Sequence, residues 1–293
     1  MVVVDFDASF TKEWHQRLYP AIEPTNPLLA QTGKVVFITG GGTGIGKAIG
    51  EGFIKAGAAG VVIIGRREAV LKSAAEELTK LGNGKTKVTY AVADILNEAA
   101  VNKAFTSAIA DHGKIDVCVA NAAFFETGKA IADYGVEELW EGIEVNIKGL
   151  IITTLAFLKV SKPGATFINI SSAAAFFPHV PKISVYASSK ASGLKFVEYL
   201  QHERPELRVF NLQPGQILTD IFVRSKFPPE NIDEAELPGG FAVWLATPES
   251  EFLRGRFVFA NWDVDGLKAR AEEIKAKNLL TSDLRGWTSG PPA

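Results

Sequence analysis

Cysteine is almost absent from this chain, since Cys118 is the only one among 293 residues. A single thiol excludes an internal disulfide and a cysteine-rich zinc site, and it is typical of proteins in a reducing compartment. An excess of basic charge is also lacking, because 31 Lys and Arg face 33 Asp and Glu for a net charge of −2. Sequence-independent binding to nucleic acid or to an anionic membrane is therefore disfavoured.

Long hydrophobic runs and a basic leader are missing as well. No apolar run reaches the ~18 residues that a membrane span needs, and Gly149 to Leu158 comes nearest. The first ten residues carry two aspartates and no basic segment, so they do not resemble a secretory signal. We therefore expect a cytoplasmic protein without a membrane partner.

Apolar residues are plentiful enough for a large core. Hydrophobic residues make up 47% and charged residues 22% of the chain, as in ordinary globular proteins. The length allows one large domain or two small ones, but no repeat or low-complexity linker divides the sequence. We predict one domain over residues 34–261, with an N-terminal arm (1–33) and a C-terminal extension (262–293). The extension has helical spacing at Lys268, Ala271, Ile274 and Leu279, and Trp287 is a candidate anchor for it.

Short β-branched runs alternate with longer amphipathic stretches from Lys34 onward, which is typical of βαβ units and a parallel sheet. The helical stretches each have one apolar face. The fold class expected is α/β, a doubly wound parallel sheet of seven strands with helices on both faces. Residues 217–240, rich in proline and acidic residues towards their end, are expected to form a surface loop that covers the substrate. Strands are expected at residues 35–39, 60–65, 87–93, 115–120, 165–170, 207–212 and 255–259.

A glycine-rich turn lies between the first expected strand and the first expected helix. Glycines let the backbone turn sharply there and approach a pyrophosphate, whose charge is met by free N–H groups and the positive end of the helix dipole. The placement of this turn predicts dinucleotide binding. The residues expected to contact the cofactor are Gly40, Gly42, Thr43, Gly44, Ile45 and Gly46.

The second expected strand ends on Gly65-Arg66-Arg67, without the carboxylate that would bind an adenosine ribose. Two guanidinium groups can instead grip a 2′-phosphate. The alternative is that both are solvated charges, although cations at a helix start oppose the helix dipole. We therefore expect NADP rather than NAD.

Tyr186 and Lys190 stand four residues apart in a stretch of helical character, which places both side chains on one face. An ammonium close to a phenol stabilises the phenolate, and proton exchange with a substrate oxygen then becomes feasible near neutral pH. The spacing alone is common on helix surfaces, so its meaning depends on its context.

Four motifs supply that context: Thr39-Gly-x-x-x-Gly-x-Gly46, Asn169-Ile-Ser-Ser172, Tyr186-x-x-x-Lys190 and Gln213-Pro-Gly215. Their order and spacing resemble the short-chain dehydrogenase/reductase family. The resemblance covers about residues 33–260 and is closest to the single-domain branch, which has the Rossmann fold. The C-terminal region is similar to that of reductases from filamentous fungi. The resemblance implies a nicotinamide-dependent oxidoreductase that forms homodimers or homotetramers.

The resemblance also implies a catalytic set. Tyr186 would protonate the carbonyl oxygen, and Lys190 would lower the pKa of Tyr186 and hold the nicotinamide ribose. Ser172 would bind the substrate oxygen, with a cap at the strand end as its alternative role and the neighbouring Ser171 as a rival. Ser172 lies 14 residues before Tyr186, so a one-residue insertion relative to the family is assumed. Asn146 would hold a water of the proton relay behind the lysine.

Further matched positions are expected to contact the cofactor. Asp94 would contact the adenine, and a helix N-cap is the alternative role. The family's Asn-Asn-Ala-Gly is replaced here by Ala120-Asn121-Ala122-Ala123. The first change removes an asparagine side chain that stabilises the sheet in the family, and the last adds a methyl group near the cofactor. The other cofactor contacts implied are Asn121, Pro214, Gly215, Ile217 and Thr219.

These features predict an NADPH-dependent carbonyl reductase, working in reverse as an alcohol dehydrogenase. A rim of Phe124, Phe125, Phe176 and Phe177 indicates an apolar, aromatic or polycyclic substrate, while His179 would either contact the substrate or lie solvated. The four histidines show no metal-ligand spacing, so no metal is expected. The alternatives are elimination, isomerisation or cyclisation on a biosynthetic intermediate, and a non-catalytic NADP sensor.

Overall fold

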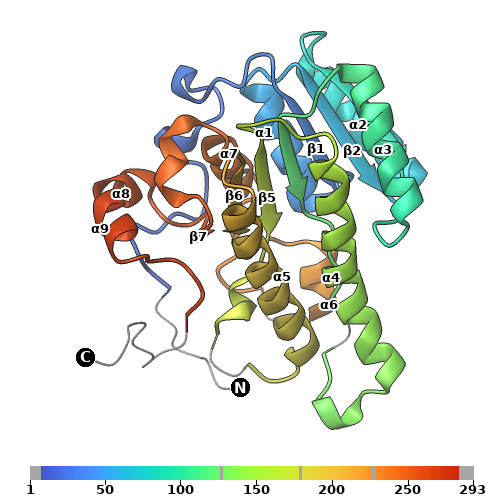
Figure 1. Cartoon of the computed structure of the whole chain (residues 1–293), viewed down its shortest axis with the longest axis vertical. Coiled ribbons are helices and arrows are strands. Elements are labelled where there is room, and N and C mark those ends of the chain that lie inside the picture. The colour runs from blue at the N-terminus through green and yellow to red at the C-terminus, as the bar shows by residue number, and fades with distance from the viewer. Residues whose placement is uncertain (1–7, 126–127, 178–179, 226–228, 284–293) are drawn as a thin grey trace.

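The computed structural model describes residues 8–125, 128–177, 180–225 and 229–283. At its centre is a seven-stranded sheet of order β3-β2-β1-β4-β5-β6-β7, in which every neighbouring pair is parallel (Figure 1). The predicted doubly wound α/β fold of the Rossmann type is confirmed, and each strand begins and ends within two residues of its expected position. The strands are β1 (Val35–Thr39), β2 (Gly60–Gly65), β3 (Lys87–Val92), β4 (Val117–Ala120), β5 (Thr166–Ile170), β6 (Arg208–Gln213) and β7 (Phe257–Phe259).

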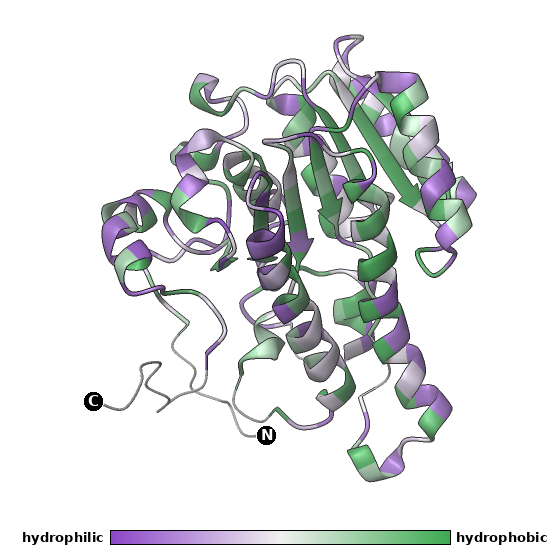
Figure 2. Ribbon diagram, in the orientation of Figure 1, coloured by the Kyte–Doolittle hydropathy of each residue, from purple (hydrophilic) through white to green (hydrophobic). Residues whose placement is uncertain are grey.

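The central strands are buried on both faces. β1, β4 and β5 are buried along their whole length, as expected for parallel strands covered by helices on either side. Figure 2 shows the central strands as mostly hydrophobic, whereas the helices carry hydrophobic and hydrophilic residues along their length. The chain reverses its direction of travel across the sheet between β1 and β4, and ligands of such folds bind at the carboxyl ends of the strands beside that point.

Two layers of helices enclose the sheet. Side chains of α1, α2 and α7 belong to one hydrophobic cluster, and those of α3 and most of those of α4 and α5 belong to the other. A left-handed Gly113 with a φ of 79° ends α3, as its position in the sequence indicates. The helices are α1 (Gly44–Lys55), α2 (Glu68–Gly82), α3 (Glu98–His112), α4 (Val136–Leu158), α5 (Ser184–Glu203), α6 (Asp220–Ser225), α7 (Glu236–Leu245), α8 (Val264–Ala269) and α9 (Ala271–Ala276). No helix of the described ranges has the length and apolarity to cross a membrane.

The prediction of a surface loop over residues 217–240 was wrong for its last part. Residues 236–240 open α7, and Leu237 to Gly240 are buried. A proline in the first turn of a helix costs no internal hydrogen bond, so Pro238 is compatible with this start. A Cβ on Gly239 would lie 2.7 Å from the carbonyl oxygen of Ala48 in α1. The glycine therefore permits close packing of α7 against α1. Composition alone does not distinguish a glycine used in this way from a glycine in a loop.

The N-terminal arm and the C-terminal extension meet beside β7. Trp14 forms an isolated antiparallel bridge with Trp262, and the arm buries Ile22 and Leu29 in the core. The extension contains α8 and α9 where helical spacing was expected, although Leu279 follows the end of α9, and Trp287 lies outside the described residues. The backbone N–H of Phe257 in β7 donates to the carbonyl of Leu280 at 2.8 Å, so the extension covers this edge of the sheet.

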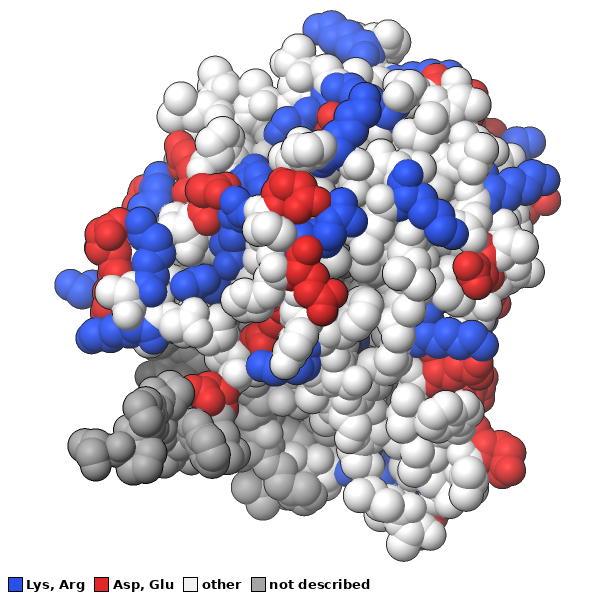
Figure 3. Space-filling model, in the orientation of Figure 1, with Lys and Arg blue, Asp and Glu red and all other residues white. Residues whose placement is uncertain are grey.

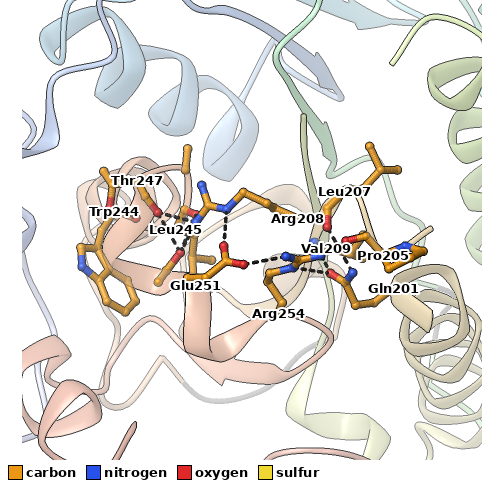
Figure 4. A network of polar contacts seen from close by, with 12 residues as sticks. Gln201, Pro205, Leu207, Arg208, Val209, Trp244, Leu245, Thr247, Glu251 and Arg254 are labelled. Atoms are coloured by element: carbon orange, nitrogen blue, oxygen red, sulfur yellow. Dashed lines mark hydrogen bonds and ion pairs between the residues drawn. The ribbon is translucent and has the colours of Figure 1, made fainter. Parts of the chain in front are cut away.

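A polar network ties the amino end of β6 to the segment before β7 (Figure 4). Arg208 donates to Glu251 at 3.2 Å and to the carbonyl of Thr247, and Arg254 donates to the same carboxylate at 2.6 Å. Gln201 of α5 accepts from the backbone N–H of Val209 at 2.9 Å. Because the network lies at the end of β6 opposite to the carboxyl edge, we assign it a structural role.

Candidate active site

The glycine turn between β1 and α1 is packed too closely for side chains. Gly40 and Gly44 have φ values of 65° and 51°, which favour glycine. A Cβ on Gly46 would lie 2.4 Å from the carbonyl oxygen of Gly40. Thr43, the N-cap of α1, makes no side-chain hydrogen bond to the helix. The N–H groups of the first turn are therefore left for a ligand anion.

Asn121, which follows β4, holds this turn in place. Its side-chain Nδ2 donates to the carbonyl oxygens of Thr39 and Gly40 at 2.9 and 3.2 Å. Its backbone N–H donates to Oγ1 of Thr39 at 2.9 Å. The structure thus gives Asn121 a positioning role, and its expected contact with the cofactor stays a prediction.

Arg67 forms an ion pair that the sequence did not indicate. Its guanidinium lies 3.4 Å from the carboxylate of Asp220 in α6, with both side chains largely exposed. The adjacent Thr219 lies directly against the glycine turn, since a Cβ on Gly44 would be 2.9 Å from its Cγ2. The start of α6 therefore covers the turn and brings a carboxylate to the end of β2. Arg66 is exposed, with no ion pair to another described residue.

Asp94, after β3, does not cap a helix. Its Oδ1 accepts from the backbone N–H of Leu96 at 3.0 Å, whereas the N-cap of α3 is Asn97, which accepts from Ala100 at 3.0 Å. The alternative role as an N-cap was therefore wrong. The expected contact with an adenine stays a prediction.

Tyr186 and Lys190 are brought together on α5, as their spacing indicates. The Lys190 Nζ lies 5.6 Å from the centroid of the Tyr186 ring, and the ring of Phe125 packs against the tyrosine at 5.0 Å. Lys190 also donates to the carbonyl oxygen of Ile170, the last residue of β5, at 3.0 Å. Burial lowers the pKa of Lys190 to about 8, so the ammonium is present at neutral pH and is lost as the pH rises through that value.

The two candidate serines differ in their exposure. Ser171 is 3% exposed, and its hydroxyl makes no hydrogen bond to a described group. Ser172 is half-buried, and its Oγ accepts from the backbone N–H of Ala174 at 3.2 Å while capping the short helix η4 (Ala173–Ala175). Of the two hydroxyls, only that of Ser172 belongs to a side chain with appreciable exposure, and the role of either serine towards a substrate oxygen stays a prediction.

Asn146 is buried in α4, and both the oxygen and the nitrogen of its amide make hydrogen bonds. Its Oδ1 accepts from the backbone N–H of Phe124 at 2.8 Å, and its Nδ2 donates to the carbonyl of Phe124 at 2.9 Å and to Oγ of Ser189 at 3.0 Å. The side chain thus clamps the loop after β4 to α4 and α5. A small polar cavity, of the kind that holds ordered water, adjoins it. The cavity lining includes Thr39, Asn146, Thr153, Asn169 and Lys190.

The segment after β6 is anchored by a residue that sequence reasoning missed. Gly215, which follows Pro214, has a φ of 95°, and a Cβ there would lie 2.6 Å from Oδ2 of Asp233. The same oxygen accepts from the backbone N–H of Gln216 at 2.6 Å, and Ile217 forms a parallel bridge with Asp233. Burial raises the pKa of Asp233. The sequence showed this carboxyl only as one of several acidic residues in the predicted loop.

Apolar side chains are exposed in the segments that follow β5 and β6. Phe176 and Phe177 are 40% and 38% exposed after β5, and Leu218 and Val223 are 61% and 65% exposed in and before α6. Of the expected rim, Phe125 is instead buried beneath Tyr186, and His179 lies outside the described residues.

One group of potential metal ligands occurs in the described part of the chain, at the contact between arm and extension. It consists of Glu13, His15 and Asp263, whose ligand atoms lie within 4.8 Å of one another. The imidazole is 3.1 Å from one oxygen of Asp263, and the other oxygen caps α8 through the N–H of Gly266 at 2.7 Å. These contacts account for the group without an ion, and the expectation of no metal stays a prediction.

Known proteins resemble this chain in sequence and in fold. Residues 34–228 match the family model of short chain dehydrogenase. The short chain dehydrogenase andI of Emericella variicolor is 31% identical over 286 residues, which cover 94% of this chain and 96% of the relative. A short chain dehydrogenase/reductase of Claviceps purpurea is 35% identical over 254 residues, 83% of each chain.

A solved short chain dehydrogenase from Burkholderia cenocepacia, in complex with NADP, has a TM-score of 0.71 at 21% identity and covers 80% of this chain and 99% of its own. A short-chain type dehydrogenase/reductase from Mycobacterium marinum has a TM-score of 0.73 at 25% identity, covering 80% of this chain and 96% of its own. The resemblance inferred from the motifs is confirmed, and this chain belongs to the short-chain dehydrogenase/reductase family of oxidoreductases.

Proposed function

We propose that this protein is an NADPH-dependent carbonyl reductase that also works in reverse as an alcohol dehydrogenase. The observation that carries the proposal is the pairing of Tyr186 with Lys190 on α5, with 5.6 Å between the ammonium and the phenol ring. The pair lies beside the carboxyl end of β5, where Lys190 reaches the carbonyl of Ile170. A proton donor beside the edge at which such folds bind dinucleotides fits reduction of a carbonyl.

The residues of the site divide the chemistry among them. The bound cofactor supplies the hydride. Ser172 donates a hydrogen bond to the substrate oxygen, and Tyr186 delivers the proton to it. The Lys190 ammonium stabilises the resulting phenolate, and this support weakens above the pKa of about 8. Asn146 holds the loop at Phe124 and borders the polar cavity that we assign to the relay water.

The substrate that we propose is an apolar ketone with an aromatic or polycyclic frame. Phe176 and Phe177 after β5, and Leu218 and Val223 after β6, present exposed apolar surface, and such surface favours a bulky hydrophobic ligand.

A ketone panel tests this substrate class. We expect purified protein to oxidise NADPH with 1-tetralone or 9-fluorenone at a kcat/KM at least roughly tenfold above that for acetone or pyruvate, because the larger ketones bury more apolar area. Absorbance of NADPH and of NADH is followed in parallel. A preference for the small polar ketones would contradict the proposed substrate class.

The preference for NADP over NAD is assigned to Arg66 and Arg67. The carboxylate of Asp220, which pairs with Arg67, works against this preference. Because that carboxylate competes for Arg67 and repels a 2′-phosphate, we expect Asp220→Asn to lower the Kd of NADPH by about three- to tenfold. The Kd of NADH should stay within about twofold, since NADH lacks the phosphate. Fluorescence titration measures both constants, and Glu230→Gln, which removes an exposed carboxylate farther along the same loop, is the matched control. Equal changes for both cofactors would contradict this assignment of Arg67.

We also infer that the protein works in the cytoplasm and self-associates. Val136, Trp140 and Leu155 of α4 are 77%, 59% and 48% exposed, and apolar surface of this kind fits a contact between copies of the chain. Figure 3 shows basic and acidic side chains intermingled on the face in view, which supports the absence of a nucleic-acid partner. The lone Cys118 is a buried thiol, which fits a reducing compartment.

A further inference from the structure

Backbone and side-chain hydrogen bonds hold the N-terminal arm against residues 261–264, where the domain passes into the C-terminal extension. The N–H of His15 donates to the carbonyl of Asn261 at 2.8 Å, and Nδ2 of Asn261 donates back to the carbonyl of His15 at 2.8 Å. The Tyr19 hydroxyl donates to the carbonyl of Trp262 and accepts from the N–H of Val264, both at 3.0 Å. We call residues 8–19 and 261–270 together the terminal brace.

Aromatic packing closes the terminal brace. The Arg270 guanidinium lies 3.7 Å from the ring centroid of Phe10 and donates to the carbonyl of Phe10 at 2.7 Å. The rings of Phe10 and Trp262 are 5.2 Å apart, and those of Trp14 and Phe259 are 6.0 Å apart. The arm is therefore packed into place rather than draped over the surface.

The brace reaches the foot of the substrate loop, where residues 215–217 meet residues 233–234. The N–H of Glu234 donates to the carbonyl of Gln16 in the arm at 2.8 Å. Asp233 is 6% exposed, and its backbone N–H donates to the carbonyl of Gln216 at 2.9 Å while its carboxyl accepts from the N–H of Gln216. The side chains of Gln16 and Asn261 lie beside that carboxyl. One end of the loop is thus tied to both halves of the brace.

The brace is also joined to Phe176, one of the exposed rings after β5. The ring of Phe176 packs edge-on against Phe257 at 4.6 Å, and Phe257 lies 5.5 Å from Phe259. Phe259 stacks on Trp262 at 4.8 Å. A continuous line of rings therefore connects the exposed side chain of Phe176 to the brace.

We propose that the terminal brace is a positioning element for the substrate pocket, and that Tyr19 and Asp233 are its key positioning residues. By fixing the foot of the substrate loop and the Phe176 rim, the brace holds α6 over the glycine turn and sets the width of the pocket for a bulky ketone. This proposal rests on the carbonyl reductase activity proposed above. Neither residue touches the reacting atoms, so loosening the brace weakens substrate binding more than it slows the chemical step.

Two small substitutions loosen the brace at different points. Tyr19→Phe removes the hydroxyl that joins arm to extension but keeps the ring, which stacks on His15 at 3.6 Å. Asp233→Ala removes the acceptor for the N–H of Gln216. Asp233→Asn is the conservative variant, because an amide oxygen can accept the same hydrogen bond. Tyr199→Phe removes a hydroxyl from an exposed tyrosine of α5 and is the matched control.

Hydrogen exchange over residues 216–225 of the full-length protein is measured together with the kinetics of 1-tetralone reduction. We expect Tyr19→Phe and Asp233→Ala to speed exchange by roughly fivefold and to raise KM by a similar factor, with kcat within about twofold, since each loses hydrogen bonds of about 1 kcal/mol. Asp233→Asn and Tyr199→Phe should match the parent protein.

Unchanged exchange in both loosened variants would overturn the proposal, and so would faster exchange with an unchanged KM. An equal rise of KM in Tyr199→Phe would also overturn it. If the parent protein reduces no ketone, the proposed activity fails, and the brace is then judged by exchange alone.

Discussion

Tyr186→Phe is expected to lower kcat for ketone reduction by about 10²- to 10⁴-fold, because proton transfer from a positioned side chain contributes that much to a rate. Phenylalanine keeps the ring that packs against Phe125 at 5.0 Å and lies 5.6 Å from the Lys190 Nζ. The substitution therefore removes the phenol hydroxyl, the proposed proton donor, and keeps these two ring contacts. The Kd of NADPH should stay within about twofold, as measured by fluorescence titration beside single-turnover kinetics.

Tyr199→Phe is the matched control, because Tyr199 lies on the same helix with 58% of its surface exposed. It should leave kcat and the Kd of NADPH unchanged. Retention of kcat within about threefold in Tyr186→Phe would remove the tyrosine from its assigned role, and the proton would then have to come from another group such as Ser172.

Gly46→Ala is expected to weaken NADPH binding by about 100-fold or more, a loss of at least ~2.7 kcal/mol. The new Cβ would lie 2.4 Å from the carbonyl oxygen of Gly40 and 2.6 Å from Nδ2 of Asn121. The first atom belongs to the glycine turn and the second to the side chain that holds the turn in place, so the clash moves the backbone that is to bind the pyrophosphate. Titration of NADPH fluorescence measures the loss.

Gly50→Ala separates this effect from a general effect of alanine in α1. A Cβ on Gly50 would lie 3.5 Å from Cδ1 of Leu78, which is an ordinary contact. We expect unchanged NADPH affinity and a free energy of unfolding up to ~1 kcal/mol higher, since glycine inside a helix is unfavourable. Equal affinity in Gly46→Ala and in the parent protein would show that the cofactor does not use this turn.

The strands of the sheet could be predicted from the sequence because their positions are encoded locally. Each buried strand is a short β-branched run bounded by turn residues, so its position needs no knowledge of its neighbours. The start of α7 was mistaken for a loop because Pro238, Gly239 and Gly240 are loop residues by composition. Their use in a buried helix depends on the contact with Ala48 in α1, which lies far away in the sequence.

In the site, too, local features could be predicted from the sequence, whereas contacts between distant positions could not. Tyr186 and Lys190 share one helix, and their proximity follows from a spacing of four residues. The pair of Arg67 and Asp220 joins positions 153 residues apart, and no local pattern announces it. Asn146 falls between these cases. A buried amide required partners, but only the fold shows that they are the backbone groups of Phe124 and the hydroxyl of Ser189.

Transfer of deuterium from NADPH labelled at nicotinamide C4 to 1-tetralone tests the proposed reaction most directly. Because hydride passes from the cofactor to the carbonyl carbon, we predict one deuterium on the carbinol carbon of each alcohol formed, with one NADPH oxidised per alcohol. Tyr186→Phe should abolish this transfer while the protein still binds NADPH. Conversion of a carbonyl compound by elimination, isomerisation or cyclisation, with the NADPH left unoxidised and no deuterium in the product, would contradict the assignment as a carbonyl reductase.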